Sequence, residues 1–152
     1  MKRPVLYLLG GAWLALSLAG AAQESPLART GVVSEEAARV ETFGWGRLIT
    51  YFDADTYSST DSLTAVAVID PGKQIHPPHV HSEEEYLMVV EGEGTWSVEG
   101  REFDAKAGDI LYAAPWDEHG IRNTGTEPLR FVVFKWNPRP VEPMPKPGEN
   151  GS

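Results

Sequence analysis

The chain has no cysteine, and it has few basic residues for its number of acidic ones. Without cysteine no disulfide forms, so the hydrophobic core and any bound metal must hold the fold. Lys and Arg total 13 against 22 Asp and Glu, which gives a formal net charge of −9. Such an acidic chain is poorly suited to nucleic acid phosphates and to anionic membrane surfaces. We therefore expect neither as a partner.

Composition places the chain among ordinary globular proteins. Its 152 residues suit one domain, and 41% of them are hydrophobic and 23% charged. Fifteen glycines and twelve prolines indicate many turns between short elements, which is typical of a β protein.

The start of the chain has the three-part pattern of a secretory signal. A basic start precedes an apolar run over residues 5–19, and small residues follow it. The run is shorter than the ~20 residues of a membrane span, and no charged stop follows. We predict a signal peptide over residues 1–22, cleaved within residues 19–23, and no stable membrane anchor. The mature protein would be exported to the periplasm or the extracellular space.

Strand patterns dominate the middle of the chain. A leader at residues 23–44, with a short helix predicted from Ser34, precedes them. Turn residues separate eight segments rich in apolar and β-branched residues, at 47–52, 63–69, 86–90, 95–98, 101–103, 110–113, 119–123 and 129–136. A proline-rich tail follows at 137–152 and is predicted to be extended or disordered. The pattern predicts an all-β domain over residues 45–136, either a sandwich or a small barrel.

All four histidines fall in two patterned stretches. His76, His79 and His81 lie close together, and His119 lies in the second stretch. On a strand His79 and His81 would point to one face, and Glu85 has the same parity. Three imidazoles and a carboxylate suit Mn, Fe, Co, Ni or Zn better than Ca or Mg. An octahedral ion held this way keeps about two positions for water or substrate.

Several neighbouring side chains have more than one plausible role. His76 suits a spare ligand or proton carrier, but a solvent-facing residue before a proline turn is the simpler interpretation. Tyr112 and Glu118 are weak candidates for acid–base chemistry. Leu87 and Val89 continue the face of Glu85 and are expected to wall a pocket. Acids at positions 83 and 84 are interpreted as a solvated loop.

The first stretch resembles the first motif of the cupin family, G-x5-H-x-H-x3/4-E-x6-G. His79, His81, Glu85 and Gly92 fit this spacing, whereas Gly72 lies one residue too early. The extra residue is best placed before the two prolines that precede His79.

The second stretch is similar to the second cupin motif, G-x5-P-x-G-x2-H-x3-N. Gly108, His119 and Asn123 keep their mutual spacing, and Pro115 is displaced by one position. Trp116 stands where the family has glycine, so we expect an altered loop before His119. We expect Asn123 to make structural hydrogen bonds in a turn.

The resemblance covers roughly residues 45–136 and implies a jelly-roll β-barrel with a divalent transition metal inside. It implies His79, His81, Glu85 and His119 as the metal ligands. It also implies a small-molecule ligand or substrate, and it is compatible with a homodimer.

Because one fold hosts many reactions, three functions stay open. The first is a metal-dependent enzyme on a small organic substrate, of the dioxygenase, decarboxylase, isomerase or lyase type. The second is a non-catalytic module that binds a small ligand or metal, such as a sensor. The third is a sugar-binding or sugar-isomerase-like cupin. A nucleotide-sugar substrate is disfavoured because Lys73, Arg101 and Arg122 do not form a basic cluster.

Overall fold

The computed structural model describes residues 27–141, so the predicted signal peptide and most of the tail lie outside the described residues. A 3-10 turn at Glu35–Ala37 precedes nine strands. The strands are β1 (Arg39–Phe43), β2 (Gly46–Asp53), β3 (Ser59–Ile69), β4 (Glu84–Glu91), β5 (Glu93–Val98), β6 (Arg101–Lys106), β7 (Ile110–Ala113), β8 (His119–Arg122) and β9 (Leu129–Pro138). Over the described range, no helix has the length and apolar character needed to cross a bilayer.

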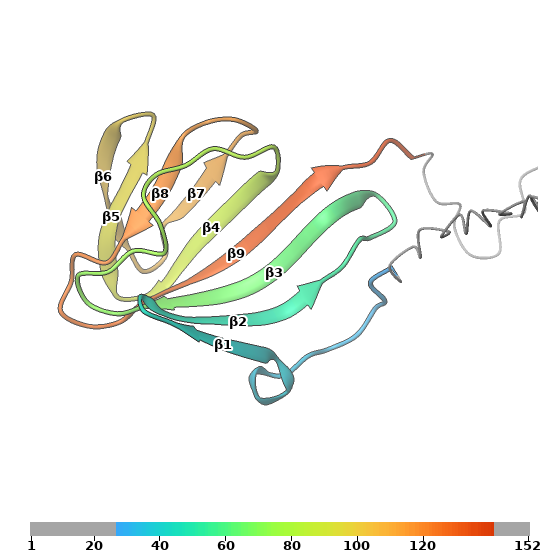
Figure 1. Cartoon of the computed structure of the whole chain (residues 1–152), viewed down its shortest axis with the longest axis horizontal. Coiled ribbons are helices and arrows are strands. Elements are labelled where there is room, and N and C mark those ends of the chain that lie inside the picture. The colour runs from blue at the N-terminus through green and yellow to red at the C-terminus, as the bar shows by residue number, and fades with distance from the viewer. Residues whose placement is uncertain (1–26, 142–152) are drawn as a thin grey trace, which may run out of the picture.

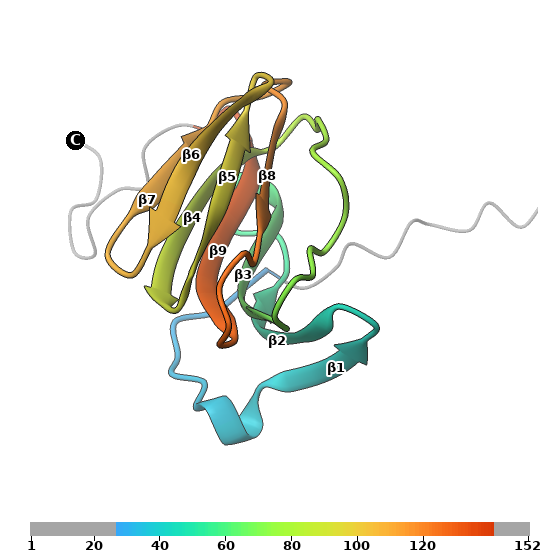
Figure 2. The ribbon, with the colours of Figure 1, turned by 90° about the vertical axis from the view of Figure 1, so that its left-hand side faces the viewer.

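The strands form two antiparallel sheets. One has six strands in the order β1-β2-β3-β9-β4-β7, and the other has three in the order β6-β5-β8. Figures 1 and 2 show the smaller sheet beside the β4 end of the larger one, with β1 and β2 extending away from it. Two antiparallel sheets closed around one interior are a jelly-roll architecture. The predicted all-β jelly-roll fold is therefore confirmed.

The main core lies between the two sheets, where alternate residues of the facing strands point inward. The larger sheet buries Leu87 and Val89 of β4 and Phe131 of β9, and the smaller sheet buries Trp96 and Ile121. Each such side chain contributes about 1.5–3 kcal/mol when fully buried. This packing fixes the strand ends that carry the candidate site.

The ordered structure extends beyond the predicted strand region at both ends. Strand β1 lies inside the predicted leader, and all five of its residues are exposed. The helix expected from Ser34 is only a 3-10 turn of three residues. At the other end β9 continues to Pro138, and Arg139 then forms a 2.7 Å ion pair with Asp55.

Candidate metal centre

The segment between β3 and β4 carries three of the four histidines and runs alongside β8 (Figure 2). Gly72 lies near its start, and its φ of +73° suits glycine. The backbones of His79 and His119 exchange two hydrogen bonds of 3.0 Å. His79 therefore sits in an isolated bridge and not in a regular strand, which the parity argument for His79 and His81 had assumed. Pro77 and Pro78, which lack N–H donors, prevent a longer ladder here.

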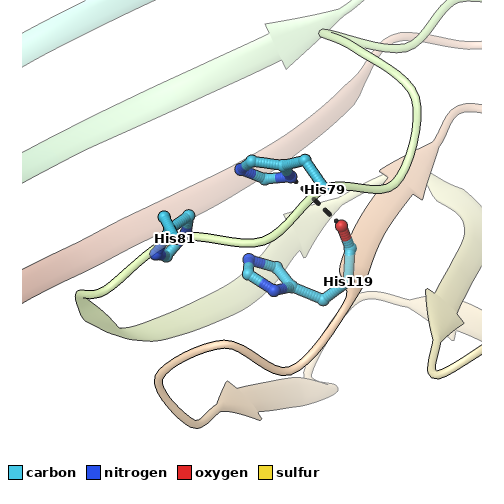
Figure 3. A group of neighbouring side chains, drawn as sticks. All are labelled: His79, His81 and His119. Carbon is cyan, nitrogen blue, oxygen red and sulfur yellow. Dashed lines mark hydrogen bonds between the residues drawn. The ribbon is translucent and has the colours of Figure 1, made fainter.

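Three histidine rings converge at this junction (Figure 3). The ring centroids of His79 and His81 lie 5.0 Å apart, and each lies 4.9 Å from that of His119. One ring nitrogen of each residue lies within 4.8 Å of the others. Two nitrogens bound to one ion are about 3–4 Å apart, given metal–nitrogen bonds of about 2 Å. The rings are thus close to the spacing that a shared metal requires.

Backbone carbonyls fix the orientation of each ring. Nδ1 of His79 donates to the carbonyl of His119 at 3.2 Å. Nδ1 of His81 donates to the Glu83 carbonyl at 3.1 Å. Nδ1 of His119 donates to the Asp117 carbonyl at 2.8 Å. Because a carbonyl only accepts, Nδ1 carries the hydrogen and Nε2 of each neutral ring keeps its lone pair. Metal-binding histidines are commonly held in this way.

Glu85, near the start of β4, points into the same cluster. One carboxylate oxygen, Oε2, lies 2.7 Å from His119 Nε2 and 3.4 Å from His81 Nε2. Burial acts to raise the pKa of Glu85, but the hydrogen bond from His119 and the charges of both histidines lower it overall. The carboxylate therefore stays ionised although it is only 7% exposed, and it is available as a fourth ligand.

Two histidines of the cluster have pKa values shifted in opposite directions. Burial acts to lower the pKa of His119, but its hydrogen bond to Glu85 outweighs burial and the pKa is raised. The pKa of His79 is lowered, first by burial and then by the charge of His76. A metal ligand must be unprotonated, so a metal would compete with a proton more strongly at His119 than at His79.

An ion pair outside the cluster supports His81. Lys135 Nζ of β9 lies 2.9 Å from Glu83 Oε1, and Glu83 Oε2 lies 3.4 Å from His81 Nδ1. Burial acts to raise the pKa of Glu83, but the hydrogen bond from Lys135 helps to lower it overall. The interpretation of Glu83 as a solvated loop residue was therefore wrong. Its partner is 52 residues away in sequence, and no local pattern indicated it.

A small cavity of about 60 Å³ lies beside the cluster. Three proposed ligands line it, namely His79, Glu85 and His119, together with the neighbouring His76. The rest of the wall is formed by Ile75, Leu87, Gly120, Ile121, Phe131 and Val133. Leu87 walls the cavity as predicted, whereas Val89 is fully buried in the core. The cavity thus places an apolar floor next to polar, metal-ligating groups.

The three candidates for acid–base chemistry lie in different places. His76 is exposed, its ring centroid is 3.9 Å from that of His79, and it borders the cavity. Tyr112 is exposed on β7 and packs against Tyr86, with ring centroids 4.9 Å apart. Glu118 is also exposed. Of these three described residues, His76 alone lines the cavity.

Trp116 gives the loop before His119 a backbone conformation typical of glycine. Its φ is +71°, which L side chains rarely adopt, and its side chain is 67% exposed. Its N–H donates to the His81 carbonyl at 2.8 Å and so joins the two histidine-bearing segments. The altered shape expected for the loop as a whole stays a prediction.

Asn123 makes the structural hydrogen bonds that the sequence predicted. Its Nδ2 donates to the carbonyls of Ile69 and Glu127 at 2.8 Å. Its Oδ1 accepts from the N–H of Gly125 at 3.0 Å. Asn123 therefore holds the turn after β8 and does not point at the cluster.

Residues 65–135 match the family model described as "Cupin domain". Two curated proteins are similar in sequence. A gentisate 1,2-dioxygenase of a Streptomyces species is 32% identical over 77 residues, which is 50% of this chain and 21% of that protein. The dimethylsulfoniopropionate lyase DddW of Ruegeria pomeroyi is 32% identical over 91 residues, 60% of this chain and 59% of that protein. The chain thus covers less than two thirds of either relative.

Among solved structures, an RmlC-like cupin from Shewanella frigidimarina superposes with a TM-score of 0.60. It is 20% identical, and the match covers 72% of this chain and 92% of that one. At this identity the likeness concerns the fold alone.

Proposed function

The chain belongs to the cupin family, and on that premise we propose that it is a metal-dependent enzyme acting on a small organic molecule. His79, His81, Glu85 and His119 would hold one divalent transition metal. The observation that carries the proposal is the convergence of three histidines beside a buried, ionised carboxylate. These nitrogen and oxygen donors suit Mn, Fe, Co, Ni or Zn.

Such a metal, when bound, supplies Lewis acid or redox chemistry at its open positions. The chain's own groups have separate tasks. Backbone carbonyls and Glu83 orient the rings, and the floor formed by Leu87, Phe131 and Val133 excludes water beside them.

The size of the cavity favours a short acyclic substrate. The cavity beside the cluster measures about 60 Å³. An engineered cavity that binds benzene measures about 150 Å³. The cavity has less than half that volume, and on this ground we favour a lyase or decarboxylase reaction over ring-cleaving oxygenation. A lyase among the relatives is consistent with this choice.

A non-catalytic binding module is the second candidate. Apart from the four proposed ligands, His76 is the one titratable side chain among the described residues that lines the cavity. Proton transfer would thus depend on His76 or on the metal-bound groups. If His76→Ala leaves turnover unchanged, His76 has no catalytic role. If the parent protein turns over no short organic acid, the binding module is favoured.

Metal analysis tests the proposed centre. We expect about one transition metal per purified parent chain, and its loss in His81→Ala and His119→Ala. His76→Ala is the matched control because it removes a histidine of the same segment that we do not assign as a ligand. Full metal retention in all three variants would overturn the centre.

We also propose export, on the basis of the basic and apolar pattern of residues 1–22. Expression in a Gram-negative host should yield a periplasmic protein that begins within residues 20–23. Export would be contradicted if all of the protein were recovered from the cytoplasm and still began at residue 1.

A further inference from the structure

A second hollow, of about 230 Å³, lies beside the cavity on the outer face of the small sheet. On β5, Thr95 and Ser97 alternate with buried Trp96, so they face outward. Arg122 of β8 pairs directly with Thr95, and Glu102 of β6 pairs with Ser97. We call this hollow the β5–β8 groove.

The segment before His79 forms the side wall of the groove. Gln74 pairs with Arg122 in an isolated bridge. A Cβ atom on Gly120 would lie 3.2 Å from Pro78 Cα, so the absence of a side chain lets the segment approach β8 closely. His76, Gly120 and Ile121 line both the groove and the metal-site cavity. The two hollows are thus neighbours across one short segment.

The groove is lined by one arginine, Arg122, and one acid, Glu102. The Arg122 side chain is exposed and makes no ion pair or hydrogen bond with any residue in the range 27–141. Three hydroxyl residues line the same hollow, namely Thr95, Ser97 and Thr124, and Thr95 Oγ1 lies 3.2 Å from Thr124 Oγ1. In a chain of net charge −9, a free guanidinium beside hydroxyl donors is suited to binding one carboxylate.

We propose that the β5–β8 groove binds the carboxylate group of a small organic acid, with Arg122 as the residue that recognises it. The hydroxyls of Thr95 and Ser97 supply further hydrogen bonds. Glu102, at the other side, disfavours a second negative charge on the ligand. This proposal rests on the proposed function in that it names monocarboxylic acids as the substrate class of the neighbouring metal site.

Titration of the isotope-labelled full chain followed by NMR tests the groove. The probes are butyrate, its neutral isostere butyramide, and inorganic phosphate. We expect butyrate to shift the amide signals of Thr95, Ser97 and Arg122 saturably, and butyramide to bind much more weakly. Arg122→Gln should weaken butyrate binding about tenfold. Arg47→Gln, which removes the same charge from β2, should leave it unchanged.

Three results would overturn the assignment: equal binding of butyrate and butyramide, unchanged binding by Arg122→Gln, or tighter binding of phosphate than of butyrate. The titration is run on protein as purified and after chelation, with the metal content of each sample measured. Butyrate binding that survives chelation supports the groove even if the parent holds no metal, in which case only the proposed metal centre fails. Binding that disappears on chelation would mean that the carboxylate binds the metal, and the groove assignment fails.

Discussion

Trp116 combines a left-handed backbone conformation with a bulky side chain. Its φ of +71° favours glycine, and its exposed ring gains little from packing. We expect Trp116→Gly to be more stable than Trp116→Ala by about 1 kcal/mol, because alanine keeps the unfavourable left-handed conformation and glycine does not. Urea unfolding of the two variants measures this difference. Equal stability, or a more stable alanine variant, would contradict the role of the positive φ.

Glu85 and His119 predict a pH dependence of the metal-free protein. The pKa of Glu85 is lowered from 4.5, so its stabilisation is present above pH 4.5 and is lost as the pH falls through the lower folded value. The pKa of His119 is raised from 6.5, so its stabilisation is present below pH 6.5 and is lost as the pH rises through the higher folded value. The pair therefore stabilises the fold most between these two values.

Glu85→Gln should accordingly destabilise the chelated protein most between pH 4.5 and 6.5, by at least about 1 kcal/mol. Thermal melts of the parent and the variant from pH 4 to 8 measure the difference. Glu118→Gln, an exposed acid outside the cavity, is the control and should show no such maximum. A difference that does not vary with pH would mean that the pair contributes through packing alone.

At the scale of elements, the approach of the segment before His79 to β8 depends on Gly120. A Cβ atom there would meet Pro78 Cα at 3.2 Å, which is tighter than most packed contacts. We expect Gly120→Ala to cost about 1–3 kcal/mol of stability and to weaken metal binding, because Pro78 precedes His79 directly. Gly44→Ala is the matched control, since nothing lies within 4 Å of its Cβ position and its φ is not positive. Unchanged metal affinity in Gly120→Ala would show that His79 is positioned independently of this contact.

Strand patterns predicted the elements well where one face is buried. The segment at 110–113 coincides with β7, and the other seven predicted segments each fall largely within an observed strand. The alternation of burial that produces this pattern is absent from β1, where every residue is exposed. Hydrogen bonding to β2 holds β1 in the sheet, and sequence periodicity does not record that contact.

The residues of the candidate site were predictable from the sequence, but the ion pair that lies beside His81 was not. The spacing predicted that His79, His81 and Glu85 lie close together, and in the structure they do. The two histidines lie on a proline-containing segment and not on a regular strand. The second patterned stretch indicated the distant His119 as a candidate, and the resemblance implied its role as a ligand. The ion pair of Glu83 with Lys135 had no local signal, because it depends on the pairing of β4 with β9.

At the scale of the whole molecule, the proposed ligands come from both sheets. Glu85 belongs to β4 of the larger sheet, and His119 begins β8 of the smaller one. His79 and His81 lie on the segment that leads from β3 to β4. A metal held by all four would therefore connect the two sheets, in a chain that has no cysteine to form a disulfide.

This arrangement predicts that metal removal destabilises the fold. A metal at 100 times its Kd stabilises the native state by about 2.7 kcal/mol, provided that it does not bind the unfolded chain. For a domain of this size that corresponds to a fall in Tm of roughly 8–15 °C on chelation. Differential scanning calorimetry of metal-loaded and chelated protein measures this fall in Tm, and restoring the metal should reverse it.

His81→Ala serves as the control, since its Tm should not respond to the chelator. An equal response in parent and variant would mean that the metal acts elsewhere on the chain, and an unchanged Tm in the metal-loaded parent would mean that no metal joins the two sheets.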